Sequence, residues 1–428
     1  MRYGKEESTK LLLEREGVNP DSRDDSGRTP LSHAARKGSE EVLKLLLERE
    51  DVNPESRDHS GRTPLSWAAS YGQEKMAKLL LELEEVNPGS QDNYGRTPLS
   101  YVAEGENEGL LKLLLAREDI NPESRDDSGR TPLSHAAGKS EVALKLLLER
   151  GKVDPESRDK GGSTPLAYAT AYGSQGSVRM LLERKEVDPD SRNDYARTPL
   201  SYAAECGSEE IVKMLLEREE VDPQSRDNDG RTPLSHAAEC ESEGIVKIPL
   251  ERGEVDPESR DNSSRTPLSH AAGAGSAGTL KLLLELGEVD PELQDHGGRT
   301  PLSYAAECES EEIVKTLLER EEVDPESRDN GGSTPLAYAA AYGSQGIVKM
   351  LLEPKEVDPD SRNDYGRTPL SHVAEYESEE IVKLLLERGE VDPKSRDNSG
   401  RTPLSHAAGA GSVGALKLLL ERGEVDPE

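Results

Sequence analysis

Apolar positions recur along the chain in short clusters that repeat every 34 residues. In one unit, residues 197–230, two stretches place apolar side chains at the spacing of a helix face, namely Leu200, Ala203 and Ala204, then Ile211, Val212, Leu215 and Leu216. A polar segment rich in Asp, Asn, Ser and Gly, residues 225–230, separates this unit from the next. The pattern predicts two short helices and a tight polar hairpin in every unit.

Start and stop signals for these helices stand at fixed places in the unit. Thr198 is a good N-cap, and Pro199 suits the first helical position, where its missing N–H has no partner to lose. Gly207 and Ser208 end the first helix and cap the second. Successive copies of Thr-Pro-Leu are 34 residues apart, except for one step of 33 after the fourth copy. The twelve copies begin at Thr29, Thr63, Thr97, Thr131, Thr164, Thr198, Thr232, Thr266, Thr300, Thr334, Thr368 and Thr402.

A helix pair of this size cannot bury its apolar faces alone, but stacked pairs can. The sequence therefore predicts an all-α solenoid of twelve helix-turn-helix repeats of about 34 residues, joined by short hairpin loops. We expect one domain, residues 1–428, in which 1–26 form an N-terminal partial repeat and 27–428 the twelve repeats. Neither end shows a clear polar capping repeat, so we expect the chain to be a fragment or the arm of a larger protein, or else to be kept soluble by its acidic surface alone.

The charge of the chain limits the classes of partner. Asp and Glu number 86 against 54 Lys and Arg, which gives a formal net charge of −32. Phosphate backbones and anionic membranes repel such a chain, so we expect it to bind neither nucleic acid nor membrane directly. No apolar segment approaches the length of a membrane span, and three cysteines give no disulfide framework. We therefore expect an intracellular, monomeric protein, cytoplasmic or nuclear, whose partners are basic or neutral protein surfaces.

The repeated segment resembles the ankyrin repeat. Residues 27–35 read Gly-Arg-Thr-Pro-Leu-Ser-His-Ala-Ala, close to the family's Gly-x-Thr-Pro-Leu-His-x-Ala-Ala, and the resemblance covers essentially the whole chain. The repeats are most similar to those of fungal ankyrin proteins, including the sensor arms of large multidomain receptors. The resemblance implies a concave groove, lined by the ends of the first helices and the hairpin tips, that grips a protein partner.

Three departures from the family pattern predict local consequences. Ser32 stands where the family has His, so the hydrogen bonds of that His must be lost or made otherwise. Glu220 and Glu322 stand where a glycine usually follows the second helix, and each costs up to about 1 kcal/mol if that position is left-handed. Pro249 falls inside a second helix, where proline costs about 3 kcal/mol, so we expect a weakened repeat there.

Two rows of side chains, counted from the threonine of each Thr-Pro-Leu, are candidates for partner contact. The fourth-position row is aromatic or imidazole throughout: His33, Trp67, Tyr101, His135, Tyr168, Tyr202, His236, His270, Tyr304, Tyr338, His372 and His406. The eighth-position row varies: Lys37, Tyr71, Gly105, Lys139, Tyr172, Cys206, Cys240, Ala274, Cys308, Tyr342, Tyr376 and Ala410. Tyr and Trp are efficient anchors at protein interfaces. The candidate partner-binding residues are therefore Trp67, Tyr71, Tyr101, Tyr168, Tyr172, Tyr202, Tyr304, Tyr338, Tyr342 and Tyr376. For the fourth-position row, packing between repeats is the competing interpretation.

Other patterns favour structural roles. Neighbouring histidines such as His236 and His270 come about one repeat apart, too far for both to hold one zinc ion. In the Ser-His pairs, adjacent helical residues point in different directions, so the histidine cannot activate the serine. We expect the arginines before the threonines, and those of the Ser-Arg-Asp hairpins, to pair with neighbouring Asp and Glu. No motif for phosphate, metal or nucleophilic catalysis stands out, so we expect no cofactor, no metal and no enzymatic activity.

The leading functional hypothesis is a non-enzymatic scaffold that binds a protein through the groove and hairpin tips. One alternative is a regulatory adaptor or transcription coregulator, which nuclear localisation would favour. Another is the sensor arm of a larger fungal receptor-type protein, which a longer upstream reading frame would reveal.

Overall fold

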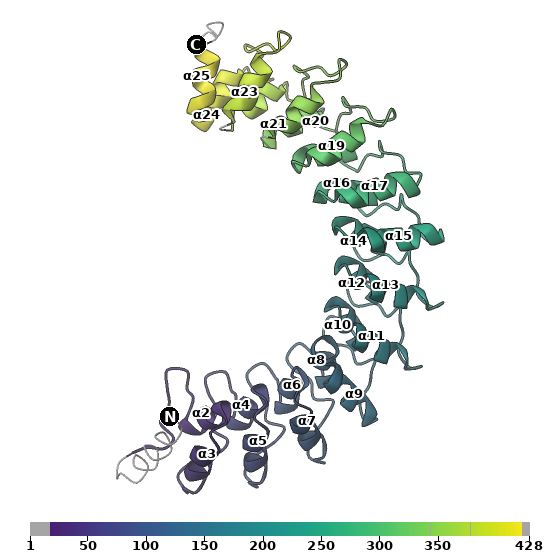
Figure 1. Ribbon diagram of the computed structural model, residues 1–428. Helices are drawn as coiled ribbons and strands as arrows, with labels where there is room; N and C mark the ends of the chain where they lie inside the picture. Colours follow the sequence, from purple (N-terminus) through teal and green to yellow (C-terminus); the bar gives the residue numbers. More distant parts are fainter. Residues whose placement is uncertain (1–17, 343, 377, 422–428) are drawn as a thin grey trace. The chain divides into compact units, whose positions relative to one another are not determined.

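The computed structural model describes residues 18–342, 344–376 and 378–421 (Figure 1). These residues form twenty-four helices and no strand. The helices come in pairs, and each pair with its hairpin corresponds to one 34-residue unit of the sequence. The predicted all-α repeat architecture is thus confirmed. The half-unit expected at the N-terminus, with its helical stretch over residues 8–14, lies outside the described residues.

Each repeat contributes a first and a second helix. The first helices are α2 (Pro30–Lys37), α4 (Pro64–Ser70), α6 (Pro98–Ala103), α8 (Pro132–Lys139), α10 (Pro165–Ala171), α12 (Pro199–Glu205), α14 (Pro233–Glu239), α16 (Pro267–Ala274), α18 (Pro301–Glu307), α20 (Pro335–Tyr342), α22 (Pro369–Val373) and α24 (Pro403–Ala410). The second helices are α3 (Glu40–Leu47), α5 (Glu74–Leu81), α7 (Glu108–Leu115), α9 (Glu141–Glu149), α11 (Gln175–Leu182), α13 (Glu209–Leu216), α15 (Glu243–Arg252), α17 (Ala277–Leu286), α19 (Glu311–Leu318), α21 (Gln345–Leu351), α23 (Glu379–Leu386) and α25 (Val413–Glu421).

Every first helix begins at the proline of Thr-Pro-Leu, as the sequence predicts. In α2, Thr29 keeps an extended backbone, and its hydroxyl accepts a hydrogen bond from the backbone N–H of Ser32 at 3.3 Å. This bond satisfies one of the N–H groups that have no partner inside the helix. The same helix ends at Gly38, whose φ of 71° is left-handed and suits glycine.

The repeats are grouped in two compact units, residues 1–206 with 217–221 and residues 207–216 with 222–428. Within each unit a first helix packs against the first helix of the next repeat and against its own second helix, as α2 does with α4 and α3. The first and second helices therefore form two parallel rows in each unit (Figure 1). That residues 1–428 behave as a single domain stays a prediction.

The core of a repeat consists of a few fully buried apolar side chains. In the repeat of α2 and α3, Leu31, Ala35, Leu43 and Leu46 are almost completely inaccessible to solvent. Burial stabilises each leucine by about 1.5–3 kcal/mol, and the small alanine lets the neighbouring helix approach closely. Each repeat thus contributes a thin core that only its neighbours complete.

Consecutive hairpins are joined by hydrogen bonds at fixed positions. The backbone N–H of His59 donates to the carbonyl of Ser26 in the preceding hairpin at 3.0 Å. The Arg57 side chain donates to the carbonyl of Gly61 in its own hairpin, and to that of Gln91 in the next. The expectation that these hairpin arginines pair with carboxylates is therefore wrong. Hairpin carbonyls lack partners from a regular ladder and lie within reach of the guanidinium, so they accept its hydrogen bonds.

The departures from the family pattern have structural outcomes. The hydroxyl of Thr29 lies 3.2 Å from that of Ser32 and 3.1 Å from that of Ser56 in the next hairpin. Ser32 stands where the family has His, and here hydrogen bonds between hydroxyl groups connect the adjacent repeats instead. The backbone at Glu220 and Glu322 is not left-handed, so the free-energy cost expected for a left-handed glutamate does not arise there. Glu288, in the same register, does have a left-handed φ of 47°.

Pro249 lies inside α15, as the sequence predicts, and the helix continues through it to Arg252. The proline ring is buried. The missing N–H leaves the carbonyl of Ile245, four residues earlier, without its usual helical donor. The size of the resulting penalty stays a prediction.

Candidate protein-interaction surface

The fourth-position row fastens each first helix to its own hairpin. The indole N–H of Trp67 donates to Asp58 at 3.2 Å, and Trp67 is only 4% exposed. The hydroxyl of Tyr168 donates to Asp159, nine residues earlier, at 2.6 Å. Tyr101, Tyr304 and Tyr338 make the same bond to an Asp, and Tyr202 accepts one from Asn193. The polar groups of these candidate side chains are thus hydrogen-bonded within their own repeat.

Burial and the carboxylate neighbour both act on these phenols. Burial and the hydrogen bond to Asp295 together raise the pKa of Tyr304 to about 12. Burial likewise raises the pKa of Tyr101 and of Tyr168 well above the ordinary range. These tyrosines therefore remain protonated donors and cannot act as bases near neutral pH.

Three histidines of the same row also connect neighbouring repeats. The Nε2 of His270 lies 3.0 Å from Asp261 in its own hairpin, and its Nδ1 lies 3.0 Å from Glu239 at the end of the preceding first helix. His135 lies in the same way between Asp126 and Glu104, and His406 between Asp397 and Glu375. Both ring nitrogens face carboxylate oxygens in these three cases, so each imidazole links the carboxylates of two adjacent repeats. The row therefore has a structural role in each repeat.

The tyrosines of the eighth-position row, in contrast, face solvent. Tyr71 is 47% exposed, Tyr172 59%, and Tyr342 and Tyr376 51% each. They lie at the ends of first helices, next to the turn into the second helix. We call the residues seven to nine positions after each threonine the helix-end surface. It holds the candidate tyrosines that can reach a partner without unfolding a repeat.

A third set of tyrosines was not among the sequence candidates. Tyr94, Tyr195 and Tyr365 are 63%, 66% and 69% exposed, more than any tyrosine of the helix-end surface. Each lies at a hairpin tip, three residues before the threonine, where other repeats carry Ser, Gly or Asp. That aromatic residue in an otherwise small or polar column was the signal that could have revealed them.

Comparison with known proteins agrees with this geometry. A family model described as ankyrin repeats (3 copies) matches residues 1–90, 83–159, 100–193, 143–227, 185–261, 219–295, 270–363 and 355–428. The chain belongs to the ankyrin-repeat family. A search of the curated proteins finds no match. Ankyrin repeats are in general modules for protein–protein interaction.

The arginines that stand directly before the threonines of the ankyrin repeats form two groups. Arg28, Arg62, Arg130 and Arg265, which stand directly before the threonine, bind the Asp of their own hairpin. Arg96, Arg197, Arg231, Arg299 and Arg367 in the same register instead bind a Glu at the end of their first helix. The expected pairing with carboxylates is confirmed for this row. Several of these guanidinium groups also cover an aromatic ring, as Arg96 covers Tyr101 with 4.1 Å to the ring centroid.

Two cysteines of the ankyrin repeats, Cys206 and Cys308, lie on the same surface without being activated. Cys206 donates to the carbonyl of Ala171 in the preceding repeat at 3.0 Å. Burial raises the pKa of its thiol, and the neighbouring Glu205 raises it further. Burial and Glu307 have the same effect on Cys308. A raised pKa leaves little thiolate, so neither thiol has the character of a nucleophile.

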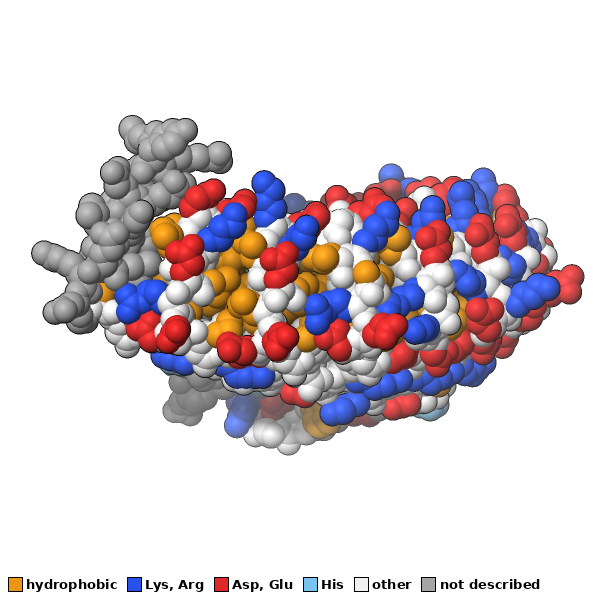
Figure 2. Space-filling model, turned by 90° about the horizontal axis from the view of Figure 1, so that it is seen from below, with side chains coloured by type: hydrophobic (Ala, Val, Ile, Leu, Met, Phe, Trp, Pro, Cys, Tyr) orange, Lys and Arg blue, Asp and Glu red, His pale blue; other side chains and the backbone are white. Residues whose placement is uncertain are grey.

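The face formed by the second helices offers a different surface. Lys44 binds Glu40, one helical turn earlier, at 2.7 Å, and Lys213 binds Glu209 at 2.6 Å. Seen from below, hydrophobic side chains lie between positive and negative ones (Figure 2). Ion pairs within single helices therefore neutralise part of the charge on this face.

Among residues 18–342, 344–376 and 378–421, no cluster of three or more His, Cys, Asp or Glu side chains has the arrangement of a metal site. In the same part of the chain, no helix has both the length and the apolar character needed to cross a bilayer.

Proposed function

We propose that this ankyrin-repeat chain is a non-catalytic scaffold that binds a protein partner through the helix-end surface and the hairpin tips. The exposure of Tyr71, Tyr172, Tyr342 and Tyr376 carries the proposal. A phenol ring that is half exposed to water gains hydrophobic and hydrogen-bonding energy when a partner covers it, at low cost in side-chain entropy. Tyr94, Tyr195 and Tyr365 extend the proposed surface to the hairpin tips.

The fourth-position row supports this surface from behind. Because Trp67 and the tyrosines at 101, 168, 202, 304 and 338 are bound to their hairpins, they hold the exposed residues in place rather than reach the partner with their polar ends. We therefore propose them as positioning residues for the interface.

The test compares two matched sets of variants. One carries Tyr71→Ala, Tyr172→Ala, Tyr342→Ala and Tyr376→Ala on the helix-end surface, and the other carries Tyr94→Ala, Tyr195→Ala and Tyr365→Ala at the tips. Both sets remove exposed rings, so circular dichroism and thermal unfolding should match those of the unaltered chain. Each immobilised chain is used to capture proteins from native cell extract, which mass spectrometry identifies.

We expect one protein to bind the unaltered chain in stoichiometric amount and to be lost with the helix-end variant. Loss with the tip variant alone would place the interface on the hairpins. Equal capture by all three chains would exclude both surfaces. An adaptor, a coregulator and a receptor arm would be separated by the identity of the captured protein and by nuclear or cytoplasmic staining of the tagged chain.

A further inference from the structure

The helix-end surface of the first repeat is basic, whereas the same position is acidic in five other repeats. Seven residues after the threonine, five repeats carry a Glu that binds an arginine of its own repeat, as Glu239 binds Arg231 at 2.8 Å. The first repeat carries Arg36 in this position, followed by Lys37. The second repeat contributes Ser70, Tyr71 and Gly72. The helix-end surface of these two repeats thus holds two cations and no carboxylate, in a chain with a formal net charge of −32.

Arg36 is held in place by aromatic rings. Its guanidinium carbon lies 4.9 Å from the ring centroid of Tyr71 and 5.5 Å from that of Trp67. Stacking on the two rings restricts the guanidinium and leaves its edge free to donate hydrogen bonds. Its Nε is buried and has no acceptor among the described residues. The side chain is therefore ordered before any partner arrives.

No carboxylate of the described residues neutralises this pair. Two hairpin carboxylates of these repeats are already paired with other arginines. Asp24 binds Arg28 at 2.9 Å, and Asp58 binds Arg62 at 3.1 Å. Neither Arg36 nor Lys37 makes an ion pair within residues 18–342, 344–376 and 378–421. Lys139, the other cation of the eighth-position row, is bound to Glu104 at 3.1 Å.

The corresponding positions of the second compact unit carry acidic side chains, of which Glu239, Glu307 and Glu375 are paired with an arginine of their own repeat. Its helix ends carry Glu239, Glu241, Glu307, Glu309 and Glu375, and no Lys or Arg among the described residues. A partner segment attracted to one of these regions is repelled by the other. Charge on the helix-end surface can therefore fix which part of a partner meets which repeats.

We propose that Arg36, Lys37 and Tyr71 form a receptor for an acidic segment of the protein partner. The proposal rests on the proposed function and adds the chemistry of the bound segment. One carboxylate of the segment accepts hydrogen bonds from the two terminal nitrogens of Arg36, and Lys37 supplies a second positive charge beside it. The exposed ring of Tyr71 covers the aliphatic part of the same segment.

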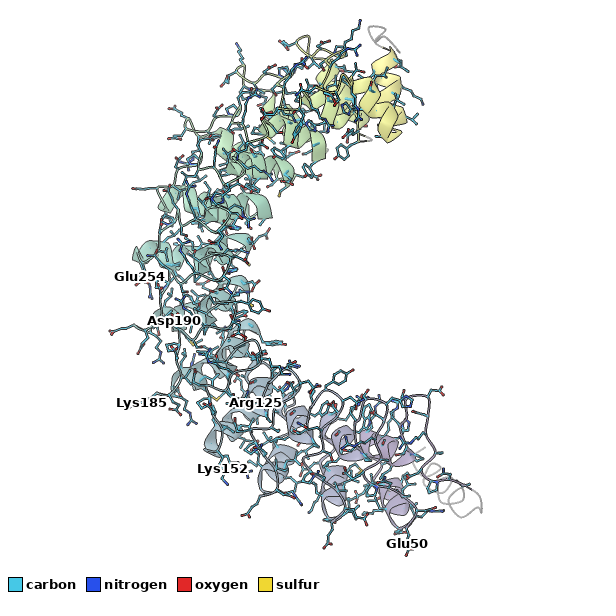
Figure 3. The ribbon with its side chains drawn as sticks, turned by 180° about the vertical axis from the view of Figure 1, so that it is seen from behind. Glu50, Arg125, Lys152, Lys185, Asp190 and Glu254 are labelled. Carbon is cyan, nitrogen blue, oxygen red and sulfur yellow. The ribbon has the colours of Figure 1, made fainter. Side chains whose placement is uncertain are left out.

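The test uses the full chain and a fluorescein-labelled octaglutamate peptide, whose binding is followed by fluorescence anisotropy. The variant is Arg36→Glu with Lys37→Glu. The control is Lys152→Glu with Lys185→Glu, which changes the net charge equally at two exposed lysines in the loops after second helices (Figure 3). Octaglutamine replaces the probe in a second control.

We expect the unaltered chain and the Lys152/Lys185 variant to bind octaglutamate alike, and the Arg36/Lys37 variant to bind at least about tenfold more weakly. Binding should weaken as salt is raised. Because Arg36 packs on two rings, the neutral pair Arg36→Gln with Lys37→Gln is also measured. Its thermal unfolding should match that of the unaltered chain, while octaglutamate binding falls.

No binding of octaglutamate at about 1 mM peptide, or an equal loss in both charge variants, would overturn the inference. A dimer seen in sedimentation that only the Arg36/Lys37 variant abolishes would overturn it too, since the acidic segment would then belong to a second copy. The proposed function would survive if the captured partner were lost with the helix-end tyrosine variant and kept by the Arg36/Lys37 variant.

Discussion

The Nε2 of His372 lies 3.4 Å from the side-chain nitrogen of Asn363. In the same row His33, His135, His236, His270 and His406 each place this nitrogen 2.9–3.1 Å from an Asp carboxylate. The amide oxygen of Asn363 accepts from the backbone N–H groups of Tyr365 and Arg367, so its nitrogen faces His372. That nitrogen can only donate, so the Nε2 of His372 accepts and carries no proton. Burial, together with the nearby positive charge of Arg367, lowers the pKa of His372 to about 4.

Replacing Asn363 by Asp should favour the protonated form of His372. A carboxylate at that place favours the charged imidazolium, and we expect the pKa of His372 to rise from about 4 by about 1–3. A histidine pKa depressed on folding gives stability that is present above about 6.5 and is lost as pH falls towards 4, so the Asn363→Asp variant should resist mild acid better. Titration of the imidazole by NMR measures the change, and an unaltered titration would contradict it.

Removing the carboxylate of Glu239 should weaken the contact between two repeats. This side chain accepts from His270 at 3.0 Å and pairs with Arg231 at 2.8 Å. The hydrogen bond from His270, together with the pairing to Arg231, lowers the pKa of Glu239 to about 2 against the opposing effect of burial. The resulting stability is present above about 4.5 and is lost as pH falls through 2. Since Glu239 is partly exposed, we expect Glu239→Gln to cost only about 1 kcal/mol at pH 7 in urea unfolding, and to lose part of that pH dependence. Unchanged stability at pH 7 would contradict the bridging role.

Glu292 should make its repeat less stable at alkaline pH. Its carboxylate accepts from the backbone of Asp324, while burial, together with the carboxylates of Asp324 and Asp290, raises its pKa to about 7. A carboxyl pKa raised on folding gives stability that is present below about 4.5 and is lost as pH rises through 7. We expect Glu292→Gln to remove a loss of about 1 kcal/mol between pH 5 and pH 8, followed by urea unfolding.

Glu55 offers the matched control for this measurement. It occupies the same register, and its carboxylate accepts from the backbone N–H of Asn87 at 3.1 Å. Asn87 stands in the position of Asp324 and brings no second carboxylate. Glu55→Gln should therefore change the pH profile less than Glu292→Gln. An equal change in both variants would show that the like charge of Asp324 has no part in the effect.

Pro249→Leu should stabilise the second compact unit. The same register holds leucine in the neighbouring repeats, at Leu215 and Leu283, and both are fully buried. Leucine restores the missing N–H and removes the clash of the ring, which together are worth about 3 kcal/mol in a helix interior. Hydrogen exchange of the α15 amides should slow accordingly, while exchange in α3 stays unchanged. Faster exchange in α15 would mean that the helix is adapted to the proline.

The repeat, its helix boundaries and much of its surface could be predicted from the sequence. Thr29 and Pro30 could be placed because capping is local chemistry, and Tyr71 could be placed on an exposed row by counting from the threonine. The partners of Arg57 could not be foreseen, since a guanidinium reaches carbonyls and carboxylates alike and the hairpin path decides between them. The aromatic character of Trp67 suggested a binding residue, but only the folded hairpin shows its indole bound to Asp58.

The bonds between hairpins always join the same positions of consecutive repeats, as Arg57 does with the carbonyl of Gln91 and Arg158 with that of Arg192. Any repeat of a compact unit can thus dock on almost any other with its hydrogen bonds intact. Recombination that deletes or copies a whole number of 34-residue units would keep these bonds between hairpins, although contacts such as that of His270 with Glu239 would depend on which repeats become neighbours. The length of the array can therefore change in evolution without a new fold. The same interchangeability has a kinetic cost, because a refolding repeat can pair with the wrong neighbour and must separate again before the native order is reached.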